Sequence, residues 1–260
     1  MHGPKGSKRP SMNDSWARVA VVTGGTRGLG AAIASRLLAD GVTVVAAYRA
    51  DDAAAERFAA AHDSFENVTT YRVDVGDPGS CVQLISHVLS TYGRIDYLVN
   101  NAGVLREHKL AYLSAEDWDN SLRINLSAAF HLAQAAVGPM REARFGRIVN
   151  IGSVTAVMGS PFQIDYAAAK AGLVGLTRSL ARSVARSGIT VNCILPGGFS
   201  TELLSELTLT DGEAIERSVP VGRFGRPQEL AHVVASLLHD DAAYVTGAVI
   251  PVDGGLGMGH

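Results

Sequence analysis

The chain has 260 residues, 47% of them hydrophobic, which is enough to bury a large core within one α/β domain. The formal net charge of -2 does not favour a nucleic-acid-binding protein. No apolar run reaches the roughly 18 residues that a membrane-spanning helix needs. The two cysteines, Cys81 and Cys193, lie far apart in the sequence. They therefore favour buried thiols in a reducing compartment, the cytoplasm, over a disulfide.

The first 15 residues differ in composition from the rest of the chain. Met1–Ser15 is rich in Gly, Pro, Ser, Lys and Arg and lacks the apolar core of a secretory signal. We expect a mobile N-terminal tail here, with a functional basic arm as the alternative. Residues 16–260 contain neither an internal repeat nor a linker, and they are predicted to form one domain.

From residue 17 onward, short apolar runs alternate with helical patterns. The predicted strands are Ala17–Thr23, Val42–Tyr48, Val68–Val73, Ile95–Asn100, Arg147–Gly152, Thr190–Leu195 and Val249–Val252. The predicted helices are Leu29–Asp40, Asp51–His62, Pro78–Tyr92, Ser114–Arg144, Tyr166–Ser187 and Pro227–His239. A break is expected within Ser114–Arg144. Strands that are apolar on both faces and separated by helices are typical of a parallel sheet covered on both sides. Right-handed crossovers then predict a single-domain, Rossmann-type doubly wound α/β fold, with ligands beyond the carboxyl ends of the strands.

The first predicted strand ends in a glycine-rich turn, Thr23-Gly24-Gly25-Thr26-Arg27-Gly28-Leu29-Gly30. Gly24 permits the tight turn, Gly28 lets the backbone approach a pyrophosphate, and Gly30 lets the helix pack closely on the strand. The free N–H groups at the start of the helix form an anion site. An ordinary strand–helix turn is the alternative, but a turn after the first strand of an α/β pattern favours dinucleotide binding.

The end of the second predicted strand, Ala47-Tyr48-Arg49, tests which cofactor fits. A ribose 2′-hydroxyl is bound by an acidic residue at this point, and a 2′-phosphate by arginine. The acid is missing, and Arg27 and Arg49 together suit a phosphate, which predicts NADP(H). In the alternative, Arg49 is a solvated residue and Asp51 or Asp52 supplies the acid for NAD(H).

A serine and a Tyr-x-x-x-Lys pair follow the fifth predicted strand. Tyr166 and Lys170 share one helix face, and Ser153 lies at the carboxyl end of the strand. Carbonyl reduction needs a proton donor to the oxygen, and a nearby ammonium lowers the pKa of a phenol from near 10 by roughly one to three units. Lys170 is also placed to hold a ribose hydroxyl, and Ser153 to donate a hydrogen bond to the developing oxyanion. The alternative for Tyr166 and Lys170, taken alone, is a half-buried aromatic residue beside a surface lysine. The alternative for Ser153 is a cap at the end of the strand.

These residues resemble the short-chain dehydrogenase/reductase family across about residues 16–256. The matching motifs are Thr23–Gly30, Asn100-Asn101-Ala102-Gly103, Asn125, Ser153, Tyr166-x-x-x-Lys170, Pro196-Gly197 and Val-Asp-Gly-Gly at 252–255. The resemblance implies that Asn125 interrupts a helix and holds a water that links Lys170 to solvent. It therefore implies four catalytic residues, Asn125, Ser153, Tyr166 and Lys170, and no metal.

The same resemblance implies further contacts with the cofactor. Asp74-Val75 should contact adenine, Asn101 the adenosine ribose, and Thr201 together with the backbone of Phe199 the nicotinamide amide. Phe199 stands where the family commonly has Ile or Val, which a main-chain contact tolerates. The expected cofactor-binding residues are Gly24, Thr26, Arg27, Gly28, Leu29, Gly30, Tyr48, Arg49, Asp74, Val75, Asn101, Ala102, Gly103, Tyr166, Lys170, Pro196, Gly197, Phe199 and Thr201. Local turn formation is the alternative for the Asn101 and Pro196 motifs.

Within the family the chain looks most like β-ketoacyl-acyl-carrier-protein reductases. The segments Val149–Val154, Tyr166–Leu173 and Ser179–Arg182 carry this resemblance. It implies NADPH-dependent reduction of a 3-oxoacyl group, a homotetramer, and docking of an acidic acyl carrier protein on Arg144 and Arg182. Solvated charges on a helix face are the alternative for the two arginines.

Residues 198–220 are predicted to form a substrate lid. An apolar wall is expected from Leu203, Leu204, Leu207 and Leu209, with Val157, Met158 and Phe162 near the carbonyl site. Such a wall suits an acyl chain, a polyketide or another apolar ketone, unless the leucines only pack the lid onto the body. Two other functions stay open: an alcohol, sugar or steroid dehydrogenase, and a cofactor-binding regulatory protein, which the complete set of catalytic residues disfavours.

Overall fold

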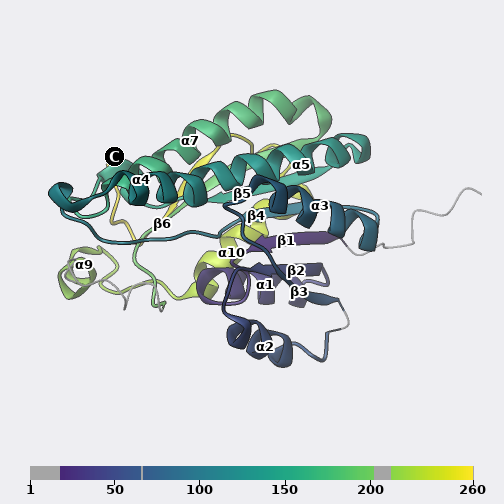
Figure 1. The fold of residues 1–260 in the computed structure, drawn as a ribbon, viewed down its shortest axis with the longest axis horizontal. Coiled ribbons are helices and arrows are strands. Elements are labelled where there is room, and N and C mark those ends of the chain that lie inside the picture. Colours follow the sequence, from purple (N-terminus) through teal and green to yellow (C-terminus); the bar gives the residue numbers. More distant parts are fainter. Residues whose placement is uncertain (1–17, 66, 202–211, 260) are drawn as a thin grey trace, which may run out of the picture.

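The computed structural model describes residues 18–65, 67–201 and 212–259 (Figure 1). One parallel sheet of seven strands has the order β3-β2-β1-β4-β5-β6-β7. Its strands are β1 (Val19–Thr23), β2 (Thr43–Tyr48), β3 (Val68–Arg72), β4 (Tyr97–Asn100), β5 (Gly146–Ile151), β6 (Ile189–Pro196) and β7 (Val249–Val252). The order reverses between β1 and β4, so the predicted Rossmann-type doubly wound sheet is confirmed. The predicted tail, Met1–Ser15, and the four lid leucines lie outside the described residues.

Helices cover both faces of the sheet. One face carries α3 (Pro78–Tyr92), α5 (Ala128–Ala143) and α7 (Ile164–Val184), and the other carries α1 (Gly28–Ala39), α2 (Asp52–Ala61) and α10 (Pro227–Leu238) (Figure 1). Leu84, Leu132 and Val184 belong to the first core, and Ile33, Phe58 and Val234 to the second. Cys81 and Cys193 are buried free thiols. Within the described ranges, no helix combines the length and apolar character needed to cross a membrane.

The helix predicted over Ser114–Arg144 is divided into three parts. They are α4 (Ala115–Leu122), a π-helical turn (Arg123–Ser127) and α5, with Arg144 in the left-handed conformation after α5. The interruption that the family resemblance implied at Asn125 is therefore present, and it is a π-helical turn. The helix α7 begins at Ile164, two residues earlier than predicted. Four short elements were not predicted, because they span too few residues for hydrophobic periodicity to show: α6 (Thr155–Met158), α9 (Gly212–Ser218) and the 3-10 turns Leu110–Tyr112 and Asp240–Ala242.

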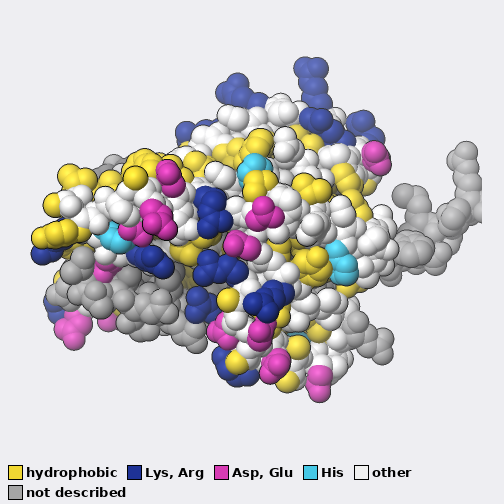
Figure 2. Space-filling view, viewed as in Figure 1, with side chains coloured by type: hydrophobic (Ala, Val, Ile, Leu, Met, Phe, Trp, Pro, Cys, Tyr) yellow, Lys and Arg dark blue, Asp and Glu magenta, His cyan; other side chains and the backbone are white. Residues whose placement is uncertain are grey.

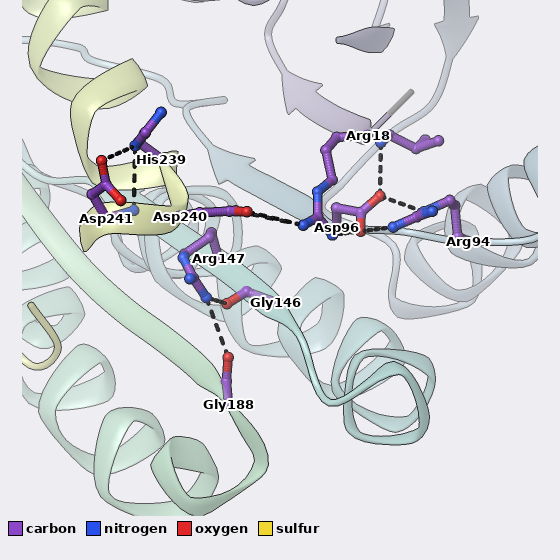
Figure 3. A network of polar contacts seen from close by, with 10 residues as sticks. Arg18, Arg94, Asp96, Gly146, Arg147, Gly188, His239, Asp240 and Asp241 are labelled. Carbon is purple, nitrogen blue, oxygen red and sulfur yellow. Dashed lines mark hydrogen bonds and ion pairs between the residues drawn. The ribbon is translucent and has the colours of Figure 1, made fainter. Parts of the chain in front are cut away.

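A buried carboxylate joins β1 and β4 at their amino ends, the edge opposite the glycine turn (Figure 3). Asp96, whose side chain is only 2% exposed, accepts hydrogen bonds from the Val19 N–H at 2.8 Å, from Arg18 Nη1 at 3.1 Å and from Arg94 Nη2 at 2.6 Å. A buried charge is tolerated only where such partners surround it. Asp96 thus stabilises the strand pair at which the sheet order reverses, and the cofactor turn follows directly from β1.

Candidate active site

A cavity of about 890 Å³ runs along the carboxyl edge of the sheet. Residues that follow each of the strands β1 to β6 line it, as expected of a ligand site at the switch point of a doubly wound fold. Every expected cofactor-binding residue except Gly30 lies on its wall. Ser153 lines it too, whereas Asn125 lies behind the wall, buried in the π-helical turn. The structure therefore brings together residues that are widely separated in the sequence.

The glycine turn has the backbone that the sequence requires. Gly24 and Gly28 have φ of 62° and 54°, in the left-handed region that glycine adopts without strain. A Cβ at Gly30 would collide with the Gly24 carbonyl, so only glycine lets α1 start this close to the turn. The side chain of Arg27, which precedes α1, makes no capping hydrogen bond to the helix. The first N–H groups of α1 therefore suit the pyrophosphate of a dinucleotide.

Asn101 fastens the glycine turn to the end of β4. Its Nδ2 donates to the Thr23 carbonyl at 2.8 Å and to the Gly24 carbonyl at 3.2 Å. The Thr23 hydroxyl in turn accepts from the N–H groups of Asn101 and Ala102, each at 3.0 Å. The Asn101 carboxamide thus hydrogen-bonds to backbone carbonyls, as the alternative interpretation of this motif predicted. The residue also lines the cavity.

The end of β2 holds two carboxylates, and both are already engaged. Asp51 caps α2 by accepting from the Ala54 N–H at 2.8 Å. Asp52 accepts from the Tyr48 hydroxyl at 3.0 Å and lies 3.6 Å from Arg72 Nη1. Arg49 lines the cavity beside them. These contacts weaken the alternative in which Asp51 or Asp52 binds a ribose 2′-hydroxyl.

The catalytic candidates converge where β4, β5 and α7 meet. Lys170 is 3% exposed, its Nζ donates to the Ile151 carbonyl at 2.8 Å, and it lies 5.4 Å from the centre of the Tyr166 ring. Asn125 bonds the backbone of Val104 twice, accepting from its N–H at 3.0 Å and donating to its carbonyl at 2.9 Å. A Cβ built on Gly103 would lie 2.8 Å from Asn125 Oδ1 and 3.6 Å from Lys170 Nζ. The side chains of Asn125 and Lys170 therefore both lie close to Gly103.

Burial sets the protonation of the pair. It raises the pKa of the Tyr166 phenol to about 12, an effect that the Ser153 hydroxyl partly offsets. Burial also lowers the pKa of the Lys170 ammonium to about 8. The prediction that Lys170 lowers the pKa of Tyr166 is therefore wrong for the chain by itself, because burial dominates and the ammonium donates to the Ile151 carbonyl. A neutral phenol is the form that can donate a proton at neutral pH.

Sequence reasoning missed several polar residues on the cavity wall, Thr155 and Gln163 among them. Thr155 donates its hydroxyl to Ser153 Oγ at 2.9 Å. Gln163 is 6% exposed, precedes α7 and makes no side-chain hydrogen bond to any other described residue. The only signal in the sequence was their closeness to Ser153 and Tyr166. Of the three apolar residues expected near the carbonyl, Met158 and Phe162 line the cavity and Val157 does not.

Comparison with known families agrees with this geometry. A family model described as enoyl-(acyl carrier protein) reductase matches residues 24–257. Together with the relatives below, this match shows that the chain belongs to the short-chain dehydrogenase/reductase family, a family of oxidoreductases. Membership implies a nicotinamide dinucleotide as cofactor, and the glycine turn, the open start of α1 and the cavity fit one.

Individual relatives carry more specific names. The chain is 41% identical over 243 residues to the 3-oxoacyl-(acyl-carrier-protein) reductase FabG of Escherichia coli (strain K12), covering 93% of this chain and 98% of that protein. It is 40% identical over 239 residues to the FabG of Haemophilus influenzae, covering 92% and 98%. It is also 40% identical over 240 residues to an acetoacetyl-CoA reductase of Rhizobium meliloti (strain 1021), again covering 92% and 98%.

Proposed function

We propose that this protein reduces the 3-keto group of a 3-oxoacyl thioester to a 3-hydroxyl, with NADPH as the cofactor. The observation that carries the proposal is the convergence of Ser153, Tyr166 and Gln163 on the cavity that the glycine turn enters. The names of the relatives, which specify 3-oxoacyl and acetoacetyl substrates, support it. Both kinds of substrate carry two carbonyl groups separated by one carbon.

Bound NADPH supplies the hydride that reaches the carbonyl carbon. In this proposal the neutral Tyr166 phenol donates a proton to the keto oxygen, and the Ser153 hydroxyl donates a hydrogen bond to the same oxygen as charge develops on it. Lys170 holds a ribose hydroxyl, and with the cofactor bound its ammonium opposes the effect of burial on the tyrosinate that results. Asn125 supports Lys170 from the π-helical turn and links it to solvent. The cofactor is held by the expected residues on the cavity wall and by the close packing at Gly30.

Gln163 supports the choice of a 3-oxoacyl substrate over a simple ketone. The Gln163 carboxamide lies at the cavity and has no hydrogen bond to another described residue, so a bound ligand can be its partner. Gln163 lies three residues before Tyr166, and both residues line the cavity. While Tyr166 and Ser153 bind the keto oxygen, the Gln163 NH₂ group is placed to bind the thioester carbonyl.

Replacing Gln163 with Met tests this role, because Met has a similar length and cannot hydrogen-bond as a donor. We expect kcat/KM for an acetoacetyl thioester to fall about 10- to 100-fold, the effect of losing one substrate hydrogen bond. For a cyclic ketone with one carbonyl, kcat/KM should stay within about threefold. The control Met158→Leu changes an apolar residue of the same wall and should affect both substrates alike. Equal losses on both substrates in Gln163→Met would contradict the assignment.

NADPH is proposed over NADH because two arginines line the adenosine end of the cavity, and the carboxylates at the end of β2 already have partners. Arg27 and Arg49 both line it, while Asp51 and Asp52 are bonded to α2, Tyr48 and Arg72. Guanidinium groups bind a 2′-phosphate through charge-assisted hydrogen bonds.

A substrate panel tests the function as a whole. The oxidation of NADPH and of NADH is followed with acetoacetyl and longer 3-oxoacyl thioesters, a crotonyl thioester, and cyclic and aromatic ketones. We expect the highest kcat/KM with 3-oxoacyl thioesters and NADPH. Preference for the crotonyl thioester would favour reduction of a C=C bond, which the description of the matching family model names. Preference for simple ketones or alcohols would favour a dehydrogenase of another specificity.

An acyl carrier protein is the proposed carrier of the thioester. Lys and Arg side chains gather over the far ends of α5 and α7, at the top of Figure 2. The exposed arginines of these helix ends are Arg141, Arg144, Arg178, Arg182 and Arg186, with Glu142 among them. Arg182 follows Lys170 by three helical turns, a rise of about 18 Å along α7. A carrier docked there has to extend its acyl arm over that distance.

Reversing two of these charges separates docking from catalysis. In Arg144→Glu/Arg182→Glu we expect KM for an acyl-carrier-protein thioester to rise about tenfold, because the carrier is acidic. The kcat/KM for the matching CoA thioester should stay within about twofold. Arg57→Glu, an exposed reversal on α2, is the control and should change neither value. Equal effects on both thioesters would contradict docking at this surface.

A homotetramer in the cytoplasm is the proposed state of the protein. The half-exposed Phe130 on α5 and the long α7 present surface that other copies can cover, and the two buried free thiols suit a reducing compartment. Sedimentation equilibrium should give the mass of four chains, and a monomer would contradict the assembly.

A further inference from the structure

The main chain around Ser153 is held on both sides by β6. The N–H of Gly152 donates to the Ile194 carbonyl at 2.7 Å, and the N–H of Val154 donates to the Pro196 carbonyl at 2.8 Å. Ser153 itself is 9% exposed. Its position is therefore fixed, and the main freedom left to it is rotation of the hydroxyl group, which decides where its proton points.

Thr155 removes that freedom. Its hydroxyl donates to Ser153 Oγ at 2.9 Å, and its N–H donates to the same oxygen at 3.2 Å. A hydroxyl oxygen has two lone pairs and one proton. Because both lone pairs accept hydrogen bonds from Thr155, the Ser153 proton has to point elsewhere. Ser153 also interacts with the Tyr166 hydroxyl, and both side chains line the cavity.

We propose that Thr155 is a positioning residue, which orients the Ser153 hydroxyl so that its proton faces the carbonyl oxygen of the substrate beside Tyr166. The inference rests on the proposed carbonyl reduction and adds a positioning residue to the four proposed catalytic residues. Thr155, Ser153 and the reacting oxygen then form a chain of hydrogen bonds that all run in one direction. Each bond in such a chain polarises the next, so the donor aimed at the oxygen is strengthened. Without the Thr155 hydroxyl, Ser153 can turn to accept a hydrogen bond, and the stabilisation of the oxyanion weakens.

Two substitutions test this inference on whichever ketone the wild type reduces. Thr155→Val keeps the shape of the side chain and removes its hydroxyl, whereas Thr155→Ser keeps the hydroxyl. We expect Thr155→Val to lower kcat about tenfold, part of the loss that follows removal of an oxyanion donor itself. KM and the Kd for NADPH should stay within about twofold. Thr155→Ser should restore kcat to within about threefold of the wild type.

The pH profile of the reverse reaction, alcohol oxidation, distinguishes a positioning role from a merely structural one. Loss of a merely structural contact would not change this profile. Oxidation of the alcohol needs the Tyr166 phenolate, and the Ser153 hydroxyl lowers the pKa of that phenol. In Thr155→Val the half-maximal pH of alcohol oxidation should therefore shift upward, and in Thr155→Ser it should not. Thr69→Val, which removes a threonine hydroxyl bonded to Tyr92 outside the cavity, should change neither kcat nor the profile.

The outcomes separate this inference from the proposed function. A wild type that reduces no carbonyl compound overturns both. A wild type that is active, with Thr155→Val matching its kcat and pH profile, overturns the role of Thr155 alone. The same holds if Thr155→Ser is as impaired as Thr155→Val, because a hydroxyl at this position would then not be what matters.

Discussion

Replacing Tyr166 with Phe is expected to lower kcat for ketone reduction by about 1,000-fold, within the range that a positioned proton donor contributes. The substitution removes one hydroxyl group and leaves the ring that lines the cavity. The Kd for NADPH, measured by fluorescence titration, should change by no more than about threefold, because the glycine turn and the start of α1 are untouched. Loss of turnover with retained cofactor binding would identify the phenol as the proton donor.

Tyr112→Phe is the matched control for this substitution. Tyr112 is 76% exposed on the 3-10 turn Leu110–Tyr112 and does not line the cavity, so its loss of a hydroxyl should leave kcat unchanged. Turnover by Tyr166→Phe above about a tenth of the wild-type rate would show that the proton comes from another group.

Replacing Lys170 with Met is expected to stabilise the fold while it abolishes the reaction. An unfolded lysine holds its proton up to pH 10.5, whereas the buried Lys170 releases it at about 8. Keeping the ammonium buried therefore costs stability below pH 8, and this cost declines between pH 8 and 10.5 and is absent above. Lys170→Met removes this cost but also loses the hydrogen bond to the Ile151 carbonyl. The net free energy of unfolding should therefore rise by about 2 kcal/mol at pH 7, which raises Tm by about 5 °C. Turnover should fall about 100-fold or more.

Melting curves at pH 7 and 10, at equal protein concentrations, measure this effect. The gain in Tm should be largest at pH 7 and small at pH 10. Lys109→Met, an exposed substitution, is the control and should leave Tm within about 1 °C at both values. A lower Tm for Lys170→Met at pH 7 would show that the ammonium is better solvated than its burial implies.

Features that depend on local spacing could be predicted from the sequence. Gly24 and Gly28 stand where the turn takes a positive φ, and Tyr166 and Lys170 share a helix face because they lie four residues apart. The alternation of apolar strands and helices gave the parallel sheet. A break within Ser114–Arg144 was expected from the pattern, but its place at Asn125 was expected only through the family resemblance, since nothing in the hydrophobic pattern distinguishes a π-helical turn.

Features that depend on burial and on long-range contacts could not be predicted. The raised pKa of Tyr166 follows from the depth of the side chain, which the spacing to Lys170 does not reveal. Gln163 becomes a candidate only because it is buried at the cavity without a hydrogen bond to the described residues. Thr155 becomes one because the chain turns into α6 just after Ser153 and brings the two hydroxyl groups together. The contacts of Asp51 with Ala54 and of Asp52 with Tyr48 and Arg72, which bear on the choice of cofactor, could not be predicted either.

In the proposed reaction, hydride from NADPH reaches C3 of a 3-oxoacyl thioester. One measurement tests it directly: the protein is incubated with an acetoacetyl thioester and NADPH that carries deuterium at both C4 positions, and the product is analysed by mass spectrometry. We predict a 3-hydroxybutyryl thioester with one deuterium at C3, formed with the consumption of one NADPH. An unchanged acetoacetyl thioester would contradict the account. So would transfer of deuterium from NADPH only in a parallel incubation with a crotonyl thioester, which would give a labelled butyryl product.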